Sequence, residues 1–187
     1  MRLLLSFLLL IALAFAPHAQ AQTPAFHPEL RSLYEADQAD RQGSDIDWKQ
    51  VDARDRGRRA RVAELAASGA LRDSRDFLHA AMVYQHGEGA DDIRQAMQWA
   101  LRAAELEPAN KSARWLACAA EDRWLQRSGK PQVWGTQYML PKPGAKWTQE
   151  PFDRKAKTDA ERVAMNVPTL AESGASLEQM NAELNKK

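Results

Sequence analysis

One short stretch of the chain combines neutral polar side chains with an aromatic ring, and it is the first candidate for chemistry. Gln132, Thr136 and Gln137 are hydrogen-bond donors and acceptors, and Trp134 stands among them. Such a composition suits the binding of a polar ligand. The alternative is that the amides and the hydroxyl satisfy backbone groups of an irregular loop, as most buried polar side chains do. The sequence leaves both interpretations open.

Charged residues just before this stretch extend the candidate set. A fixed guanidinium at Arg123 can either brace loop carbonyls or face a ligand, and Asp122 precedes it. His86 adds a titratable ring, which a hydrolytic or ligand-binding site would need in a cleft. The candidate ligand- or partner-binding residues are therefore His86, Asp122, Arg123, Gln132, Trp134, Thr136 and Gln137.

Other kinds of chemistry find little support. His79 and His86 are seven residues apart, which corresponds to a rise of about 10.5 Å along a helix and is too far for one metal ion. The Gly87–Gly89 loop lacks the Lys and Ser/Thr of a phosphate loop. We predict no metal site and no cofactor. The sequence leaves catalysis open but favours a non-enzymatic role, and we name no catalytic residue.

Cys118 is the only cysteine, so no disulfide can form within the chain. It stands among alanines in a predicted helix, where a cysteine usually serves as a small buried hydrophobe.

The charge balance excludes two classes of partner. The chain has 187 residues, with 26 basic and 25 acidic side chains. A net charge this close to zero argues against a dedicated nucleic-acid binder or a polybasic membrane binder. A basic run between Arg54 and Arg61 alternates with acidic residues, so we interpret it as a solvated helix face.

The first residues have the pattern of a signal peptide. Arg2 supplies the positive charge, Leu3 to Ala16 form an apolar run, and Ala19–Ala21 is a small-residue cleavage site. The apolar run of about 14 residues is shorter than the roughly 20 that span a membrane. We expect a signal peptide at 1–21, cleavage after Ala21 and one helical domain at 22–187. Localisation would be periplasmic or secreted, with no membrane attachment after cleavage.

Three consecutive helices in residues 77–127 organise the rest of the chain. The middle helix begins near Asp91 and Asp92, has apolar residues at three- and four-residue steps, and is stopped by Pro108. Because it is apolar over most of its circumference, it must be covered on more than one side.

Four further helices are predicted outside this centre, at 29–42, 47–68, 158–165 and 176–185. Thr158 and Glu161 form a capping box at the start of the third. In the second, the expected buried residues are Trp48, Val51, Val62, Leu65 and Ala66. The prediction is an all-α fold with six or seven helices.

The segment between residues 129 and 151 contains prolines and glycines together with Trp134, Tyr138 and Trp147. Aromatic residues between helix breakers indicate an ordered, packed insertion. It is either irregular or a short β-hairpin that pairs 132–140 with 146–148 across a turn at Pro143 and Gly144.

The central helices resemble the Sel-one-like variety of tetratricopeptide repeat at Tyr84, Gly87, Gly89, Ala96, Trp99, Ala103 and Ala104. The step into the next helix resembles ordinary tetratricopeptide repeats at Ala103, Leu106, Pro108, Asn110 and Trp115. The resemblance covers one unit and part of a second. It implies helical hairpins in a compact domain and an interaction module for another periplasmic protein or a peptide.

A second resemblance covers roughly residues 76–172. The run from Gly129 to Tyr138 contains a Gly-Lys-Pro-Gln-x-aromatic-Gly-Thr-Gln signature, and 159–162 and 168–172 continue the pattern. These segments resemble an uncharacterised bacterial family of unknown function, which implies no activity. The predicted function is therefore an exported protein- or peptide-interaction module, with a small ligand-binding or hydrolytic protein using the 132–138 loop as the alternative.

That alternative places a site where the 132–138 loop folds back on the helix ends near Gly87 and Arg123. It predicts that Gln137→Ala weakens binding with little change in thermal midpoint, whereas Trp134→Ala costs several kcal/mol. If both substitutions destabilise the protein equally, Gln137 is a structural brace.

Overall fold

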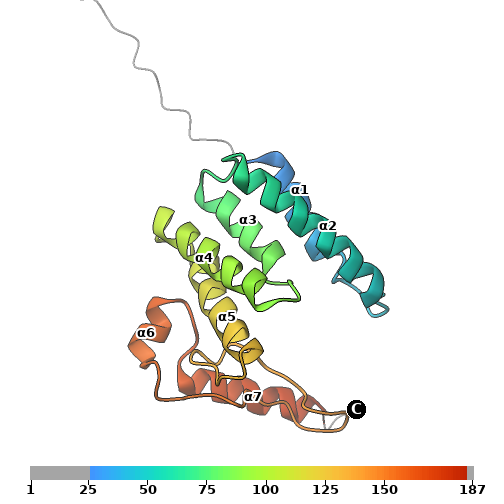
Figure 1. Ribbon diagram of the computed structural model, residues 1–187. Coiled ribbons are helices and arrows are strands. Elements are labelled where there is room, and N and C mark those ends of the chain that lie inside the picture. Colours follow the sequence, from blue (N-terminus) through green and yellow to red (C-terminus); the bar gives the residue numbers. More distant parts are fainter. Residues whose placement is uncertain (1–25, 185–187) are drawn as a thin grey trace, which may run out of the picture.

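The computed structural model describes residues 26–184, so the predicted signal peptide and its cleavage position lie outside the described residues. Within that range the chain forms seven α-helices and no β-strand (Figure 1). The helices are α1 (Pro28–Ala39), α2 (Trp48–Ala67), α3 (Ser74–Tyr84), α4 (Ala90–Leu106), α5 (Lys111–Arg127), α6 (Asp159–Ala164) and α7 (Leu170–Leu184). The predicted all-α class is confirmed.

Short polar side chains begin most of these helices. Asp47 accepts a hydrogen bond from the third residue of α2, and Asn110 does the same for α5. Asp73 and Asp76 form a reciprocal capping box at the start of α3. Each cap satisfies a backbone N–H that would otherwise have no partner in the first helical turn. Thr158 and Glu161 form the predicted capping box of α6.

Small residues let the central helices approach closely. α4 packs against both α3 and α5, as its apolar circumference predicts. Ala81, Ala100 and Ala117 meet beside Leu116 at this junction, and all four side chains are almost completely buried. Cys118 is fully buried as well, as predicted.

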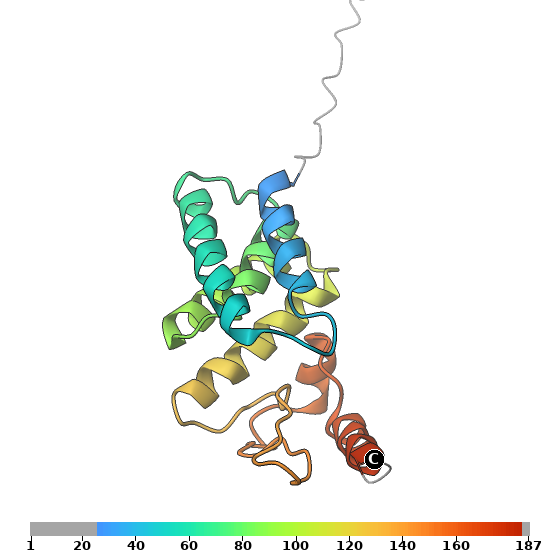
Figure 2. The ribbon, with the colours of Figure 1, turned by 90° about the vertical axis from the view of Figure 1, so that its right-hand side faces the viewer.

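α1, α3 and α5 lie together on one side of the molecule. α1 contacts α3, and α3 contacts α5, although none of these pairs is consecutive in the chain. In the sequence, α2 lies between α1 and α3, and α4 lies between α3 and α5 (Figures 1 and 2). A surface formed by α1, α3 and α5 therefore combines residues that are far apart in the sequence.

The basic run of α2 differs from its prediction as a solvated face. Arg58 and Arg59 are buried. Arg58 donates to the buried carboxylate of Asp55 at 2.6 Å, and Arg41 of the α1–α2 link reaches the same carboxylate. The acids that alternate with the arginines hold α2 against the end of α1, which is why part of the run is buried. Trp48, expected to be buried, is 57% exposed because it lies in the first turn of α2 at the edge of the hairpin.

The insertion between α5 and α6 is irregular. Only two isolated bridges occur in it, a parallel one between Gln132 and Phe152 and an antiparallel one between Met139 and Thr148. The predicted β-hairpin is not formed, because single bridges replace a continuous ladder.

The last helix begins earlier than predicted, at Leu170 instead of Ser176. The Thr169 hydroxyl and the Glu172 carboxylate exchange hydrogen bonds with each other's backbone N–H groups. This pair is a second capping box, which fixes the helix start ahead of Gly174. In residues 26–184 no helix is long and apolar enough to cross a membrane.

Candidate functional site

A single carboxylate on α5 anchors the loop that contains most of the predicted site residues. Asp122 is completely buried. Its Oδ1 accepts from the backbone N–H groups of Val133 at 2.7 Å and Trp134 at 2.8 Å. Its Oδ2 accepts from both the N–H and the hydroxyl of Thr136, at 2.9 and 2.7 Å. The carboxylate therefore fixes three successive parts of the loop on α5.

Two buried glutamines replace the missing strand ladder. Gln132 Nε2 donates to the carbonyls of Gln137 and Gln149, while its Oε1 accepts from the Gln137 N–H at 3.0 Å. Gln149 Nε2 in turn donates to the carbonyl of Gly135. These amides satisfy buried backbone groups that have no regular secondary structure to bind them.

Gln137 joins this loop to the helices. Its Nε2 donates to the carbonyl of Ala119 at 3.1 Å, and its Oε1 accepts from Arg123 Nη2 at 3.2 Å. Arg123 also donates from Nη1 to the carbonyl of Gln85, just beyond the end of α3, at 2.8 Å. The loop thus folds back on the helix ends near Arg123, where the sequence placed it.

Trp134 docks the loop into the C-terminal core. Its ring is 6% exposed and packs against Cys118 and Val167. Its Nε1 donates to Glu121 at 2.7 Å. Gly135 follows with φ +66°, and a Cβ there would collide with the ring of Phe152, so glycine is required at this bend.

The seven predicted site residues fall into two groups. Asp122, Gln132, Trp134, Thr136 and Gln137 meet in the loop anchor, and their polar atoms bind mainly backbone groups. These contacts favour the bracing interpretation that the sequence left open. His86 lies elsewhere, with Nδ1 3.0 Å from the buried carboxylate of Asp37 on α1, and Arg123 lies between the two places.

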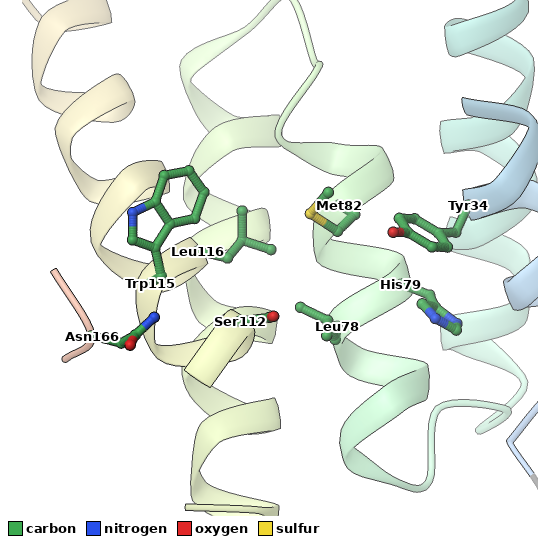
Figure 3. Close-up of a pocket in the computed structure, with 8 residues that line it drawn as sticks. All are labelled: Tyr34, Leu78, His79, Met82, Ser112, Trp115, Leu116 and Asn166. Carbon is green, nitrogen blue, oxygen red and sulfur yellow. The ribbon is translucent and has the colours of Figure 1, made fainter. Parts of the chain in front are cut away.

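A groove that the sequence did not indicate crosses α1, α3 and α5. Its volume is about 360 Å³. Figure 3 shows the side chains that line it. Tyr34 comes from α1, and α3 and α5 supply most of the remaining side chains. The lining residues are Tyr34, Leu78, His79, Met82, Ser112, Trp115, Leu116 and Asn166.

Aromatic rings stand at two sides of this groove. Tyr34 and His79 stack with their ring centroids 4.6 Å apart and their planes 7° apart. Across the groove, Trp115 remains 39% exposed, and the flexible side chain of Met82 lies between the two sides in Figure 3. An exposed tryptophan beside a methionine gives a large apolar contact area that can adapt its shape.

The imidazole of His79 is the titratable ring of the groove wall. Its Nδ1 is buried and has no hydrogen-bond partner among residues 26–184. Burial lowers the pKa of His79 below the usual range, although nearby Asp76 acts in the opposite direction. The ring is therefore neutral at neutral pH and adds to the apolar character of the groove.

Sequence reasoning missed the groove because its parts are distant in the chain. The only local signals were the Leu78–Met82 spacing on one helix face and a tryptophan at 115. His79 was considered only as a metal ligand. Within the described residues, no group of three or more His, Cys, Asp or Glu side chains is arranged to hold a metal ion.

Comparison with family models, curated proteins and solved structures finds no match to this chain. The two family resemblances drawn from the sequence stay predictions.

Proposed function

We propose that this protein is an exported interaction module that binds an apolar peptide segment of another protein in the groove over α1, α3 and α5. The observation that carries the proposal is the groove itself. Three non-consecutive helices contribute side chains to one apolar depression that contains a partly exposed tryptophan, Trp115. Exposed apolar surface collected in one place is typical of binding sites for proteins or peptides.

The lining chemistry indicates the type of segment. Leu78, Met82 and Leu116 form an apolar floor, while Ser112 and Asn166 offer polar groups on the α5 side. A volume of about 360 Å³ is near the lower end of the roughly 300–1,000 Å³ of small-molecule pockets. It therefore suits one or two large side chains of a peptide, with leucine or an aromatic residue as the anchor.

Two sequence features support this function. The signal-peptide pattern up to Ala21 supports export, and N-terminal sequencing of the mature protein is expected to begin at Gln22. Recovery of a chain that still begins at Met1 would contradict export. The tetratricopeptide resemblance supports peptide binding, and its residues Tyr84 and Trp99 pack edge to face with centroids 4.6 Å apart.

The test is selection of binding peptides from a displayed random library on the mature chain, followed by titration of the selected peptides. Trp115→Ala removes the exposed ring of the groove and is expected to weaken binding about thirtyfold, which corresponds to roughly 2 kcal/mol for a truncated hot-spot tryptophan.

Trp48→Ala provides the matched control, because Trp48 is also exposed on a helix but lies outside the groove. It is expected to leave peptide affinity unchanged. Equal losses in both variants, or selected peptides without apolar anchors, would contradict the groove as the binding site.

A further inference from the structure

A second depression lies at the opposite end of the same helices and has a different character. Its volume is about 390 Å³, and it lies between the α1–α2 link, the start of α2, the end of α3 and the end of α5. Arg41, Arg123 and Arg127 all face it, together with His86, Asp52 and the exposed Trp48. We call it the arginine cleft.

The three arginines of the cleft differ in whether a carboxylate pairs with them. Arg41 donates to the carboxylates of Asp37 and Asp55, at 3.1 and 2.5 Å. Asp55 also receives Arg58, and Asp37 lies beside His86. These two buried acids are thus already paired with Arg41, and Asp55 is paired with Arg58 as well.

Arg123 and Arg127 differ from Arg41 in their partners. In residues 26–184 neither forms an ion pair with a carboxylate. Arg123 donates only to neutral oxygens, the carbonyl of Gln85 and the amide of Gln137. Arg127 donates from Nη1 to the carbonyl of Glu88 at 2.9 Å.

The surroundings of Arg123 make this arrangement costly. Burial, together with the neighbouring charges of Arg127 and Arg41, lowers the pKa of Arg123. A partly buried guanidinium that faces other cations gains from a nearby negative charge. Asp52 is the one lining acid that is exposed, so water screens its charge from the partly buried guanidinium.

We propose that the arginine cleft binds a small organic oxyanion, with its phosphate or carboxylate group between Arg123 and Arg127 and its flat organic part against Trp48. The guanidinium groups supply charge-assisted hydrogen bonds. Arg127 is exposed and lines the cleft, and only its Nη1 is used in the contact with Glu88 within residues 26–184. The indole of Trp48 is 57% exposed and gives the flat part of the ligand an aromatic face. The proposal does not depend on peptide binding in the groove.

Three probes of similar shape test the ligand chemistry: phenyl phosphate, benzoate and phenol. Binding to the mature chain is measured by titration calorimetry in chloride buffer at constant ionic strength. One or both anions are expected to bind, and whichever binds more tightly identifies phosphate or carboxylate as the recognised group. Binding of phenol as tightly as the anions, or binding of none of the three, would overturn the proposal.

Matched substitutions locate the bound probe. Arg127→Gln removes a charge from the cleft and is expected to weaken anion binding about tenfold, the scale of one lost charge-assisted hydrogen bond. Arg94→Gln is the control, because Arg94 is exposed on α4 and does not line the cleft. Equal losses in both variants would mean a general charge effect and would overturn the proposal.

Substitution of the two exposed tryptophans separates the cleft from the groove. Trp48→Ala is expected to weaken binding of the tighter aromatic anion, while Trp115→Ala leaves it unchanged. The peptides selected for the groove should show the reverse pattern. Unchanged anion binding in Trp48→Ala would remove the stacking part of the proposal, and circular dichroism melts of each variant confirm that the protein is folded.

Discussion

At the scale of single residues, one side chain often determines the conformation of a whole loop. Asp122 is such a residue, because its two oxygens accept four hydrogen bonds from Val133, Trp134 and Thr136. A buried carboxylate with this many donors is replaced poorly by any neutral side chain. These contacts favour a structural role, and they bind two of the candidate site residues, Trp134 and Thr136, directly.

Asp122→Asn should therefore be strongly destabilising. The asparagine NH₂ group would face either the two donors of Thr136 or those of Val133 and Trp134. We expect a loss of about 3 kcal/mol in the free energy of unfolding, measured by urea denaturation. Asp52→Asn, at an exposed acid, should change it by less than about 0.5 kcal/mol. Similar values for the two variants would show that the loop does not depend on Asp122.

The contacts of Gln137 revise the expectation for its substitution. Gln137→Ala removes hydrogen bonds to Ala119 and Arg123, so we expect it to lower stability by about 1–2 kcal/mol. Trp134→Ala should cost about 4 kcal/mol, the usual scale for a buried tryptophan. Urea denaturation separates the two values. An unchanged midpoint in Gln137→Ala would restore the binding role predicted from the sequence.

His79 should make stability depend on pH in mildly acidic solution. Burial lowers the pKa of the folded imidazole, so the unfolded chain takes up a proton at His79 more readily. As the pH falls below about 6.5, the unfolded state is favoured and the free energy of unfolding decreases. Denaturation at several pH values between about 7.5 and 5 measures this slope. His79→Gln should flatten it, and an unchanged slope would show that other groups cause it.

At the scale of elements, one buried arginine connects the last third of the chain. The guanidinium of Arg162 on α6 is fully buried and donates to the carbonyls of Trp134 and Pro168, at 2.5 and 2.7 Å, and to the hydroxyl of Ser173 at 3.0 Å. The loop, α6 and α7 are therefore joined through a single planar group. An ammonium group lacks the fork geometry that reaches all three oxygens.

Arg162→Lys should loosen these elements together. We expect amide hydrogen exchange in α6, and in α7 near Ser173, to become about tenfold faster, because losing one buried hydrogen bond costs about 1.4 kcal/mol. Exchange in α3 and α4 should stay unchanged. Arg154→Lys, at an exposed arginine, serves as the control. If only the global unfolding rate changes, Arg162 does not connect the three elements specifically.

The helices could be predicted because their signals are local. Thr158 caps α6 as predicted, Asp47 caps α2 at the predicted start of that helix, and α4 ends two residues before Pro108. The start of α7 was misplaced because Thr169 and Glu172 were assigned to a family motif and not to a capping box. The sequence left open whether the insertion is irregular or a β-hairpin. Its conformation depends on hydrogen bonds from Asp122 and Gln149 to backbone groups that are distant in the chain.

The binding surfaces were harder still to predict. The groove needs Tyr34, His79 and Trp115 on three helices, and no spacing in the sequence indicates that these helices are neighbours. Trp48 was expected inside the protein because a tryptophan in a helical pattern resembles a core residue. Only the packing of the hairpins shows that its ring is exposed.

At the scale of the whole molecule, the groove and the arginine cleft share helices. On α5, Leu116 lines the groove and Arg123 lines the cleft, seven residues further on. Seven residues correspond to two turns, which return to the same helix face after a rise of about 10.5 Å. Tyr34 on α1 lines the groove, and Arg41, two residues beyond the end of α1, lines the cleft. The two surfaces are therefore held at a fixed spacing by rigid elements.

The irregular insertion has a consequence for how the molecule can be divided. Its exposed turn near Gly144 lies between backbone pairs that join Met139 to Thr148 and Gln132 to Asp153. Chain continuity at this turn therefore contributes little to holding α6 and α7 in place. We expect residues 22–143 and 144–187, expressed as separate polypeptides, to assemble into the native fold when mixed, with recovery of native circular dichroism as the measure. Such a pair would form a split protein whose reassembly can report the proximity of two fused proteins, whereas fragments that stay apart would show that the turn is needed.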